Sequence, residues 1–257
     1  MRDGTPHILS LKRTLSMFEA VITDGGRSSV SELAREIGMP IATAHRQVTT
    51  LVAEGYLSPV GGGRHVAGSR LLGLLHRLDE KQVVANVAAP LLHHLAARVR
   101  SVVQLGTFEN DMVTYRIKTG RGAADLFTRV GMQLEAYCSG IGKVLLAHLP
   151  KGEQEAYLSG GPFVALTERT IVDPDRLRQE LDVVFEQGYA IDNNEIAHGL
   201  RCMAVPLCKS DGTMLAAISV SQAGGVKRRI SDGKLLRLLR ETAQCIEQSA
   251  FGQSRSP

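Results

Sequence analysis

Residues 188–202, GYAIDNNEIAHGLRC, contain a high density of side chains that could do chemistry: two carboxylates, a histidine, an arginine and a cysteine. Such side chains could hold a metal ion, exchange protons with a substrate, or attack it as a thiolate. They could also form the wall of a pocket that binds a ligand without changing it. The carboxylates are Asp192 and Glu195, and they are followed by His198 and Cys202.

The spacing in this segment does not favour a metal site. Zinc needs three or four converging donors, and the segment has one histidine among oxygen donors with no second histidine nearby. Gly188 and Gly199 bracket the segment and favour a strand that leads into a short turn. We therefore predict neither a metal nor a cofactor. An enzyme that uses Asp192, Glu195 and His198 as acid and base on a small carboxylate is an alternative function.

The cysteines do not suggest a disulfide framework. There are four, without a C-x-x-C pair and without a secretory leader before them: Cys138, Cys202, Cys208 and Cys245. We therefore expect reduced thiols in a cytoplasmic protein. Cys202 lies in Arg-Cys-Met-Ala-Val-Pro, a buried-strand context where cysteine usually acts as a small apolar residue. A regulator that senses oxidation through Cys138 or Cys202 is another alternative.

Composition narrows the class of protein. The 257 residues suffice for one large or two small domains, and 44% hydrophobic with 22% charged residues is typical of a globular chain. No run approaches the roughly 20 apolar residues of a membrane-spanning helix, so we predict no membrane partner. The net charge of +4 permits contact with nucleic acid without requiring it.

The first part of the chain predicts a helix-turn-helix. A first helix should bury Leu11, Leu15, Phe18, Val21 and Ile22, which recur at helical spacing before Gly25-Gly26. A second helix should open at Ser29, with Glu32 as its capping-box partner, and stop at Gly38. After Pro40 a third helix should carry an apolar face up to Gly55, formed by Ala44, Val48, Leu51 and Val52.

A hairpin follows these helices. Residues 56–60 and 64–67 flank Gly61-Gly62-Gly63, which in a winged helix-turn-helix would form the wing. The third helix would then present its outward, early residues to DNA bases. The predicted DNA-binding residues are Arg13, Thr43, His45, Arg46, Gln47 and Arg64. A small helical domain that binds a protein partner instead of DNA is the alternative for this region.

Residues after the hairpin predict a linker and a second domain. Leu71, Leu74, Leu75 and Leu78 form a narrow helical stripe that could pair across a dimer, and a further helix is expected over 83–99. Strands are predicted at 102–108, 112–117, 189–192, 202–208 and 215–220, and helices at 140–149, 175–186 and 232–248. Clustered strands without regular βαβ alternation favour an α+β domain with an antiparallel sheet.

Motifs along nearly the whole chain resemble the IclR-type bacterial transcriptional regulators. In order, they are LKRTL at 11–15, ELAREIGMP at 32–40, TAHR at 43–46, LVAEGY at 51–56, SGIGKVLLA at 139–147, RTI at 169–171, GYA at 188–190, GLRCMAVP at 199–206 and AAISVS at 216–221. The chain departs from the family at Ile41 and Ala42, where a Lys-Ser pair is common, and at Gln47, where an apolar residue is common. We therefore do not transfer an operator sequence.

The resemblance implies a two-domain α+β regulator. Its parts would be a winged helix-turn-helix DNA-binding domain at 1–70, a linker and dimerisation helix at 71–85, and a GAF-like effector-binding domain at 86–257. The implied partners are double-stranded operator DNA, a small organic carboxylate and other copies of the chain, as a homodimer or a dimer of dimers. The resemblance does not tell activator from repressor.

Among the possible roles of residues 188–202, the resemblance favours the wall of a binding pocket. The amides of Gly140 and Ile141, at a helix N-terminus, would hold a carboxylate. Ser219 and Ser221 would face the same ligand, because they are two apart on a strand, and Asp192 would accept from a ligand hydroxyl or a water. Lys143 could reach an acid or lie in solvent. The remaining predicted pocket residues are Cys202 and the apolar residues Leu126, Leu134 and Leu200.

Overall fold

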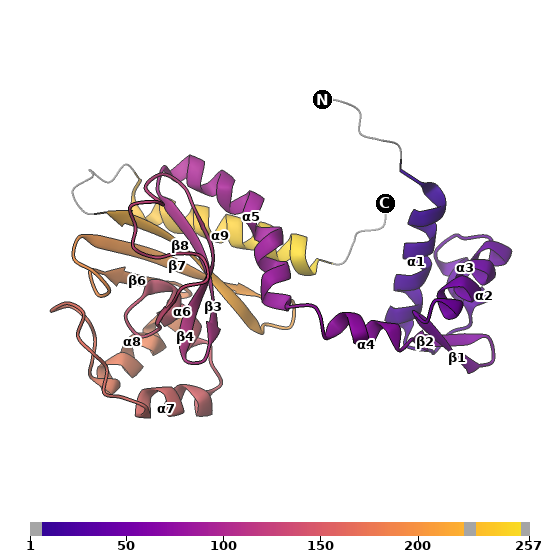
Figure 1. The fold of residues 1–257 in the computed structure, drawn as a ribbon, viewed down its shortest axis with the longest axis horizontal. Coiled ribbons are helices and arrows are strands. Elements are labelled where there is room, and N and C mark those ends of the chain that lie inside the picture. The colour runs from indigo at the N-terminus through magenta and orange to yellow at the C-terminus, as the bar shows by residue number, and fades with distance from the viewer. Residues whose placement is uncertain (1–6, 224–229, 253–257) are drawn as a thin grey trace. The chain divides into compact units, whose positions relative to one another are not determined.

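The computed structural model describes residues 7–223 and 230–252 (Figure 1). The chain forms two compact units, Met1–Asp79 and Glu80–Pro257. In the described residues, no helix combines the length and the apolar character that crossing a membrane would require.

The first unit confirms the predicted helix-turn-helix and hairpin. Its described elements are α1 (Leu9–Asp24), α2 (Val30–Glu36), α3 (Ile41–Ala53), β1 (Leu57–Gly61), β2 (Arg64–Ala67) and α4 (Arg70–Leu75). The predicted capping box is present, because the Ser29 side chain accepts from the amide of Glu32 and the Glu32 carboxylate accepts from the amide of Ser29. Gly61, Gly62 and Gly63 all have positive φ, which explains why glycines form the tip of the hairpin.

The prediction of which α1 residues are buried is only partly right. Met17 and Val21 are buried against α2 and α3, but Leu11 and Leu15 are 55% and 52% exposed and Ile22 is 38% exposed. The core of so small a unit reaches only the second half of α1. The apolar residues of the first half are therefore left at the surface of this chain.

The expected single linker helix over 71–85 is interrupted. Helix α4 ends at Leu75, and α5 (Glu80–Val99) begins the second unit. Leu71 is half-buried, whereas Leu74, Leu75 and Leu78 are 42%, 63% and 59% exposed. Leu78 lies beyond the end of α4, so the four leucines do not form one continuous helical stripe.

The second unit is built on the antiparallel sheet that was predicted. Its strands are β3 (Val102–Glu109), β4 (Met112–Thr119), β5 (Gln133–Glu135), β6 (Ala190–Asn193), β7 (Leu200–Cys208) and β8 (Met214–Ala223). They pair in the order β5-β4-β3-β8-β7-β6, and every pairing is antiparallel. The short strand β5 and the helix α7 (Lys151–Ser159) were not predicted.

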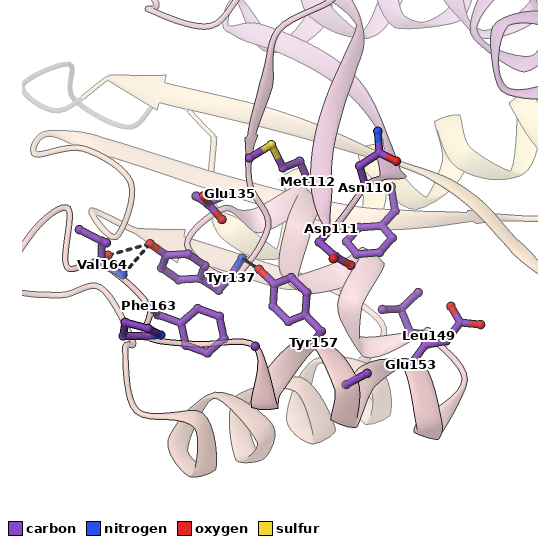
Figure 2. A pocket seen from close by; sticks show the side chains of 14 residues that line it. Asn110, Asp111, Met112, Glu135, Tyr137, Leu149, Glu153, Tyr157, Phe163 and Val164 are labelled. Atoms are coloured by element: carbon purple, nitrogen blue, oxygen red, sulfur yellow. Dashed lines mark hydrogen bonds between the residues drawn. The ribbon is translucent and has the colours of Figure 1, made fainter.

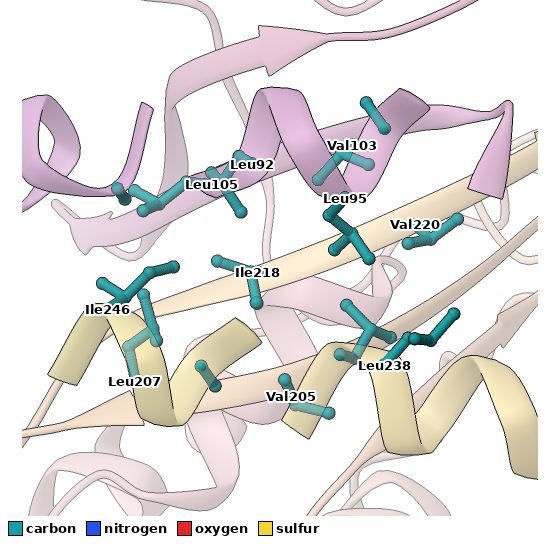
Figure 3. Packing of buried hydrophobic residues seen from close by; sticks show 14 of the residues in the cluster. Leu92, Leu95, Val103, Leu105, Val205, Leu207, Ile218, Val220, Leu238 and Ile246 are labelled. Carbon is teal, nitrogen blue, oxygen red and sulfur yellow. The ribbon is translucent and has the colours of Figure 1, made fainter. Parts of the chain in front are cut away.

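Helices cover both faces of this sheet. On one face, α5 and α9 (Asp232–Phe251) pack on alternate residues of the strands, such as Leu105, Val205 and Ile218 (Figure 3). On the other face, α6 (Gly140–Ala147) contacts β7 and β8, and α8 (Pro174–Gln187) packs on α6. Because strand side chains alternate, Ser219 and Ser221 of β8 face the α6 side.

Candidate functional site

A narrow cavity lies where the sheet meets the N-terminal end of α6. The strand register aligns Asp192 with Cys202, Cys202 with Ser221, and Gln104 with Ser219. This alignment brings four strands together on the face toward α6. Eight of the nine predicted pocket residues line the cavity: Leu126, Gly140, Ile141, Asp192, Leu200, Cys202, Ser219 and Ser221.

The position of Leu134 differs from the prediction. It pairs with Val113 across β4 and β5 and packs in the apolar cluster around α6 and α7, and it is not among the residues that line the cavity. The prediction missed the lining residues Gln104, Tyr115, Phe127, Thr128, Ser139 and Ile196. Gln104 had a detectable signal, because it is a polar residue inside the apolar run Val102-Val103-Gln104-Leu105.

The cavity is nearly closed in this conformation. Its volume of about 10 Å³ is close to that of one water site. The connection between β4 and β5 covers it with Leu126, Phe127 and Thr128. Lys118 holds this connection by donating to the carbonyl oxygens of Leu126 and Thr128. A ligand larger than water would therefore have to displace this connection.

A chain of hydrogen bonds runs across the cavity wall. The Cys202 thiol donates to Ser221 Oγ at 3.2 Å, and Ser221 donates to Gln104 Oε1 at 3.2 Å. Gln104 Nε2 then donates to Thr128 Oγ1 at 2.8 Å. The chain links three strands to the covering connection, so a ligand that displaced one member would disturb the others.

The N-terminal end of α6 presents unused donors to this cavity. Ser139 caps the helix by accepting from the amide of Gly142 at 3.0 Å. In the described part of the chain, the amides of Gly140 and Ile141 donate to no acceptor. A Cβ at Gly142 would lie 2.0 Å from the carbonyl oxygen of Ala136, so only glycine allows α6 to start here. The free amides and the helix dipole together make a seat for an anion.

Asp192 is a fully buried carboxylate in the same wall. Its Oδ1 accepts from the amide of Glu195 at 2.7 Å, while Oδ2 has no hydrogen-bond partner among the described residues. Burial is the largest cause that raises the pKa of Asp192, to about 6, and the nearby Glu195 carboxylate acts in the same direction. Asp192 is therefore neutral in acid and ionised above neutral pH.

Lys143 is buried and pairs with acidic side chains, so of its two predicted positions contact with an acid is confirmed and a place in solvent is wrong. Its Nζ donates to Glu195 at 2.7 Å, to Glu180 at 2.8 Å and to the carbonyl oxygen of Ile191 at 2.7 Å. Burial by itself would lower the pKa of Lys143, but Glu195 and Glu180 outweigh it and raise that pKa. The ammonium group ties α6 to α8 and to the turn after Asp192.

The geometry gives little support to acid–base catalysis, redox sensing or a metal site. His198 does not line the cavity, and its side chain is 71% exposed and pairs with Glu168 at 3.6 Å. Burial raises the pKa of the Cys138 thiol to about 12 and raises that of Cys202 still further, which suppresses the thiolate needed for redox sensing. No group of three His, Cys, Asp or Glu side chains within the described ranges could hold a metal ion.

The predicted DNA-facing residues lie on the first unit at three places. Arg13 is exposed on α1 and Arg64 on the hairpin. On α3, His45 and Arg46 are exposed, whereas Thr43 and Gln47 are half-buried. His45 Nε2 is hydrogen-bonded to Ser31 Oγ at 3.0 Å, which fixes it against α2. Among residues 7–223 and 230–252, Arg13, Arg46 and Arg64 form no ion pair.

Comparison with known proteins shows which family has this architecture. Residues 10–61 match the family described as IclR helix-turn-helix domain, and residues 76–248 match the one described as bacterial transcriptional regulator IclR C-terminal. The HTH-type transcriptional regulator XynR of Escherichia coli strain K12 is 27% identical over 253 residues, which cover 98% of each chain. The Pca regulon regulatory protein of Pseudomonas putida is 28% identical, over 97% of this chain and 87% of that protein.

A solved structure is also similar. The IclR homologue from Microbacterium hydrocarbonoxydans, complexed with 4-hydroxybenzoate, is 28% identical with a TM-score of 0.61, and the match covers 94% of this chain and 98% of that one. The helix-turn-helix, the antiparallel sheet with its helices and both family matches thus agree, and the chain is a transcriptional regulator that belongs to the IclR family.

Proposed function

We propose that the cavity at the N-terminal end of α6 binds a small organic carboxylate, and that this binding changes how the first unit binds operator DNA. The observation that carries the proposal is the pair of free amides at Gly140 and Ile141, which face the buried polar group of Asp192, Ser219 and Ser221. The relative solved with 4-hydroxybenzoate, an organic acid, supports this ligand class.

In this proposal the effector carboxylate accepts from the amides of Gly140 and Ile141. Ser219 and Ser221 donate to the effector, while Leu126 and Leu200 contribute apolar contacts. Entry displaces the connection between β4 and β5, and the effector then prefers one arrangement of the dimer or tetramer over another. The spacing of the recognition helices changes with that arrangement. The exposed leucines Leu74 and Leu75 and those of α1 contribute to the contact between copies.

The effector site can be tested by thermal unfolding with aliphatic and aromatic carboxylates. A selective ligand raises the stability of the native state by about 2.7 kcal/mol at 100 times its dissociation constant. Gly140→Ala should fold, because the added Cβ would meet its neighbours at 3.6 Å or more, but its methyl group would fill the cavity beside the free amides. We expect this variant to lose the ligand-induced shift.

Gly152→Ala is the matched control for this experiment. Gly152 is also helical, in α7, and an added Cβ there meets nothing within 4 Å. Gly152→Ala should therefore keep the ligand-induced shift. An unchanged shift in Gly140→Ala would place the effector elsewhere.

DNA binding by α3 can be tested through Arg46. Arg46→Ala removes one exposed cation of the recognition helix, so the slope of log K against log salt should fall by about one. Operator affinity should be measured by fluorescence anisotropy at several salt concentrations. Arg98→Ala removes an exposed arginine from α5, in the second unit, and should leave both affinity and slope unchanged. Equal behaviour of the two variants would favour a protein partner for α3 over DNA.

A further inference from the structure

The second unit contains another cavity, separate from the one at α6. It lies between the turn that joins β3 to β4, the end of β5, and α7 with the loop that follows it (Figure 2). Its volume is about 440 Å³, which is within the range of small-molecule sites. None of its lining residues also lines the cavity at α6.

Aromatic rings form the floor of this second cavity. The ring centroids of Tyr137 and Phe163 are 4.8 Å apart, and those of Tyr157 and Phe163 are 5.7 Å apart with the rings stacked. Phe108 extends the group, with its centroid 6.2 Å from that of Tyr157. Figure 2 shows the rings of Tyr137, Tyr157 and Phe163 next to one another on one side of the cavity.

Hydrogen bonds fix these rings in place. The Tyr137 hydroxyl donates to the carbonyl oxygen of Val164 at 2.7 Å and accepts from the amide of Val164 at 3.2 Å. The Tyr157 hydroxyl accepts from the amide of Tyr137 at 3.2 Å. The aromatic floor is therefore formed before any ligand arrives, which lowers the entropy cost of binding.

The charges around the floor are all negative. Asp111, Glu135 and Glu153 line the cavity, and no lysine, arginine or histidine does. In the parts of the chain that the structure describes, none of these three carboxylates forms an ion pair. The ammonium of Lys81 lies near Phe108, but it donates to the Phe108 carbonyl oxygen at 2.6 Å and pairs with Glu109 at 3.6 Å. An anionic ligand would be repelled by this arrangement.

A compact metal ion is also a poor match for it. The described residues offer no group of three His, Cys, Asp or Glu side chains that could hold a metal ion. An organic cation whose charge is spread over alkyl groups does not need several carboxylates around one point. Its alkyl groups can lie on the aromatic faces, where the ring quadrupoles attract the positive charge, while separate carboxylates add a long-range attraction.

We propose that this second cavity binds a small organic cation of the alkylammonium or quaternary ammonium class. The site does not depend on the carboxylate cavity at α6 and would give the regulator a second ligand. The rings of Tyr157 and Phe163 would contact the alkyl groups, and Glu135 and Glu153 would balance the charge from the rim.

The test uses two probes of nearly equal shape, choline and its uncharged isostere 3,3-dimethylbutan-1-ol. Titration of the full chain, with ligand-observed NMR as the readout, should show saturable choline binding. The affinity for choline should be at least about fivefold higher than that for the alcohol. The double variant Glu135→Gln with Glu153→Gln should weaken choline binding by about tenfold and leave the alcohol unaffected. Phe163→Leu should weaken choline binding without a change of charge.

The control is the double variant Glu168→Gln with Glu186→Gln, which makes the same change of net charge outside the cavity. It should keep choline binding. Equal affinity for the two probes, no saturable choline binding, or equal losses in the two double variants would each overturn the proposal. The proposal would also be overturned if the Glu135→Gln/Glu153→Gln variant sedimented differently from the natural chain and the natural chain did not bind choline. The cavity would then be a contact between copies of the chain.

Discussion

Affinity for a carboxylate effector should fall about 50-fold between pH 6 and pH 8, with a slope that approaches about tenfold per pH unit above pH 7. The cause is Asp192, whose pKa is raised to about 6, foremost by burial. Below this pKa the protonated Oδ2 can donate to the effector. Above it the ionised Asp192 carboxylate repels a second carboxylate in the same cavity.

The tyrosine and the two thiols near Asp192 do not change charge in this range. Burial raises the pKa of Tyr115 and of Cys202 far above neutrality, and it raises that of Cys138 to about 12. Burial also raises the pKa of Glu195, against the effect of Lys143 at 2.7 Å, but Glu195 does not line the cavity. Asp192 is therefore the group that should set the pH dependence of binding.

Isothermal titration calorimetry from pH 5.5 to pH 8 measures this dependence. Repeating it in two buffers of different ionisation enthalpy should reveal uptake of close to one proton per effector above pH 7. Asp192→Asn keeps the acceptor for the amide of Glu195 but cannot ionise, so its affinity should be independent of pH. An affinity of the natural chain that does not change with pH, without proton uptake, would contradict this role of Asp192.

The unliganded protein offers an independent readout of the same pKa. A carboxyl whose pKa is raised from 3.8 in the unfolded chain to about 6 in the folded one favours folding below pH 3.8, and this contribution is lost as pH rises through 6. Asp192→Asn should therefore gain about 2.4 kcal/mol relative to the natural chain between pH 4 and pH 8. Denaturation in urea at several pH values measures this difference.

Lys143→Met should destabilise the second unit by about 3–5 kcal/mol. The substitution removes the positive partner of Glu195, whose side chain is 8% exposed, and leaves that carboxylate buried without compensation. Glu180 is 32% exposed and can turn toward solvent, so it contributes less to the loss. Urea denaturation of the full chain, followed by far-UV circular dichroism, measures the change.

Two further variants separate this effect from a general loss of packing. Lys143→Met combined with Glu195→Gln removes the unpaired buried charge of Glu195 and should recover a large part of the stability. Lys151→Met makes the same substitution at a surface ion pair with Asp182, with side chains 79% and 53% exposed, and should cost less than about 1 kcal/mol. If the double variant were as unstable as Lys143→Met, the loss would come from packing and not from charge.

Local patterns in the sequence determined much of this protein. The spacing of apolar residues and the Ser29–Glu32 capping box predicted α2 and α3, and glycines predicted the tip of the hairpin. Alternation along strands, together with the family resemblance, predicted that Asp192, Cys202, Ser219 and Ser221 line one cavity. These signals act over a few residues, so they can be detected without knowing which elements pack together.

Only the tertiary structure decided which elements cover one another. Gln104 meets Ser221, 117 residues away, because β3 and β8 are neighbours in the sheet. Lys143 is buried because α8 and the turn after β6 close over it with Glu180 and Glu195, which lie 37 and 52 residues further along the chain. Periodicity assigns a residue to a face of its own helix or strand, but the burial of that face depends on long-range packing. For the same reason, the exposed half of α1, the position of Leu134 and the second cavity followed only from the folded chain.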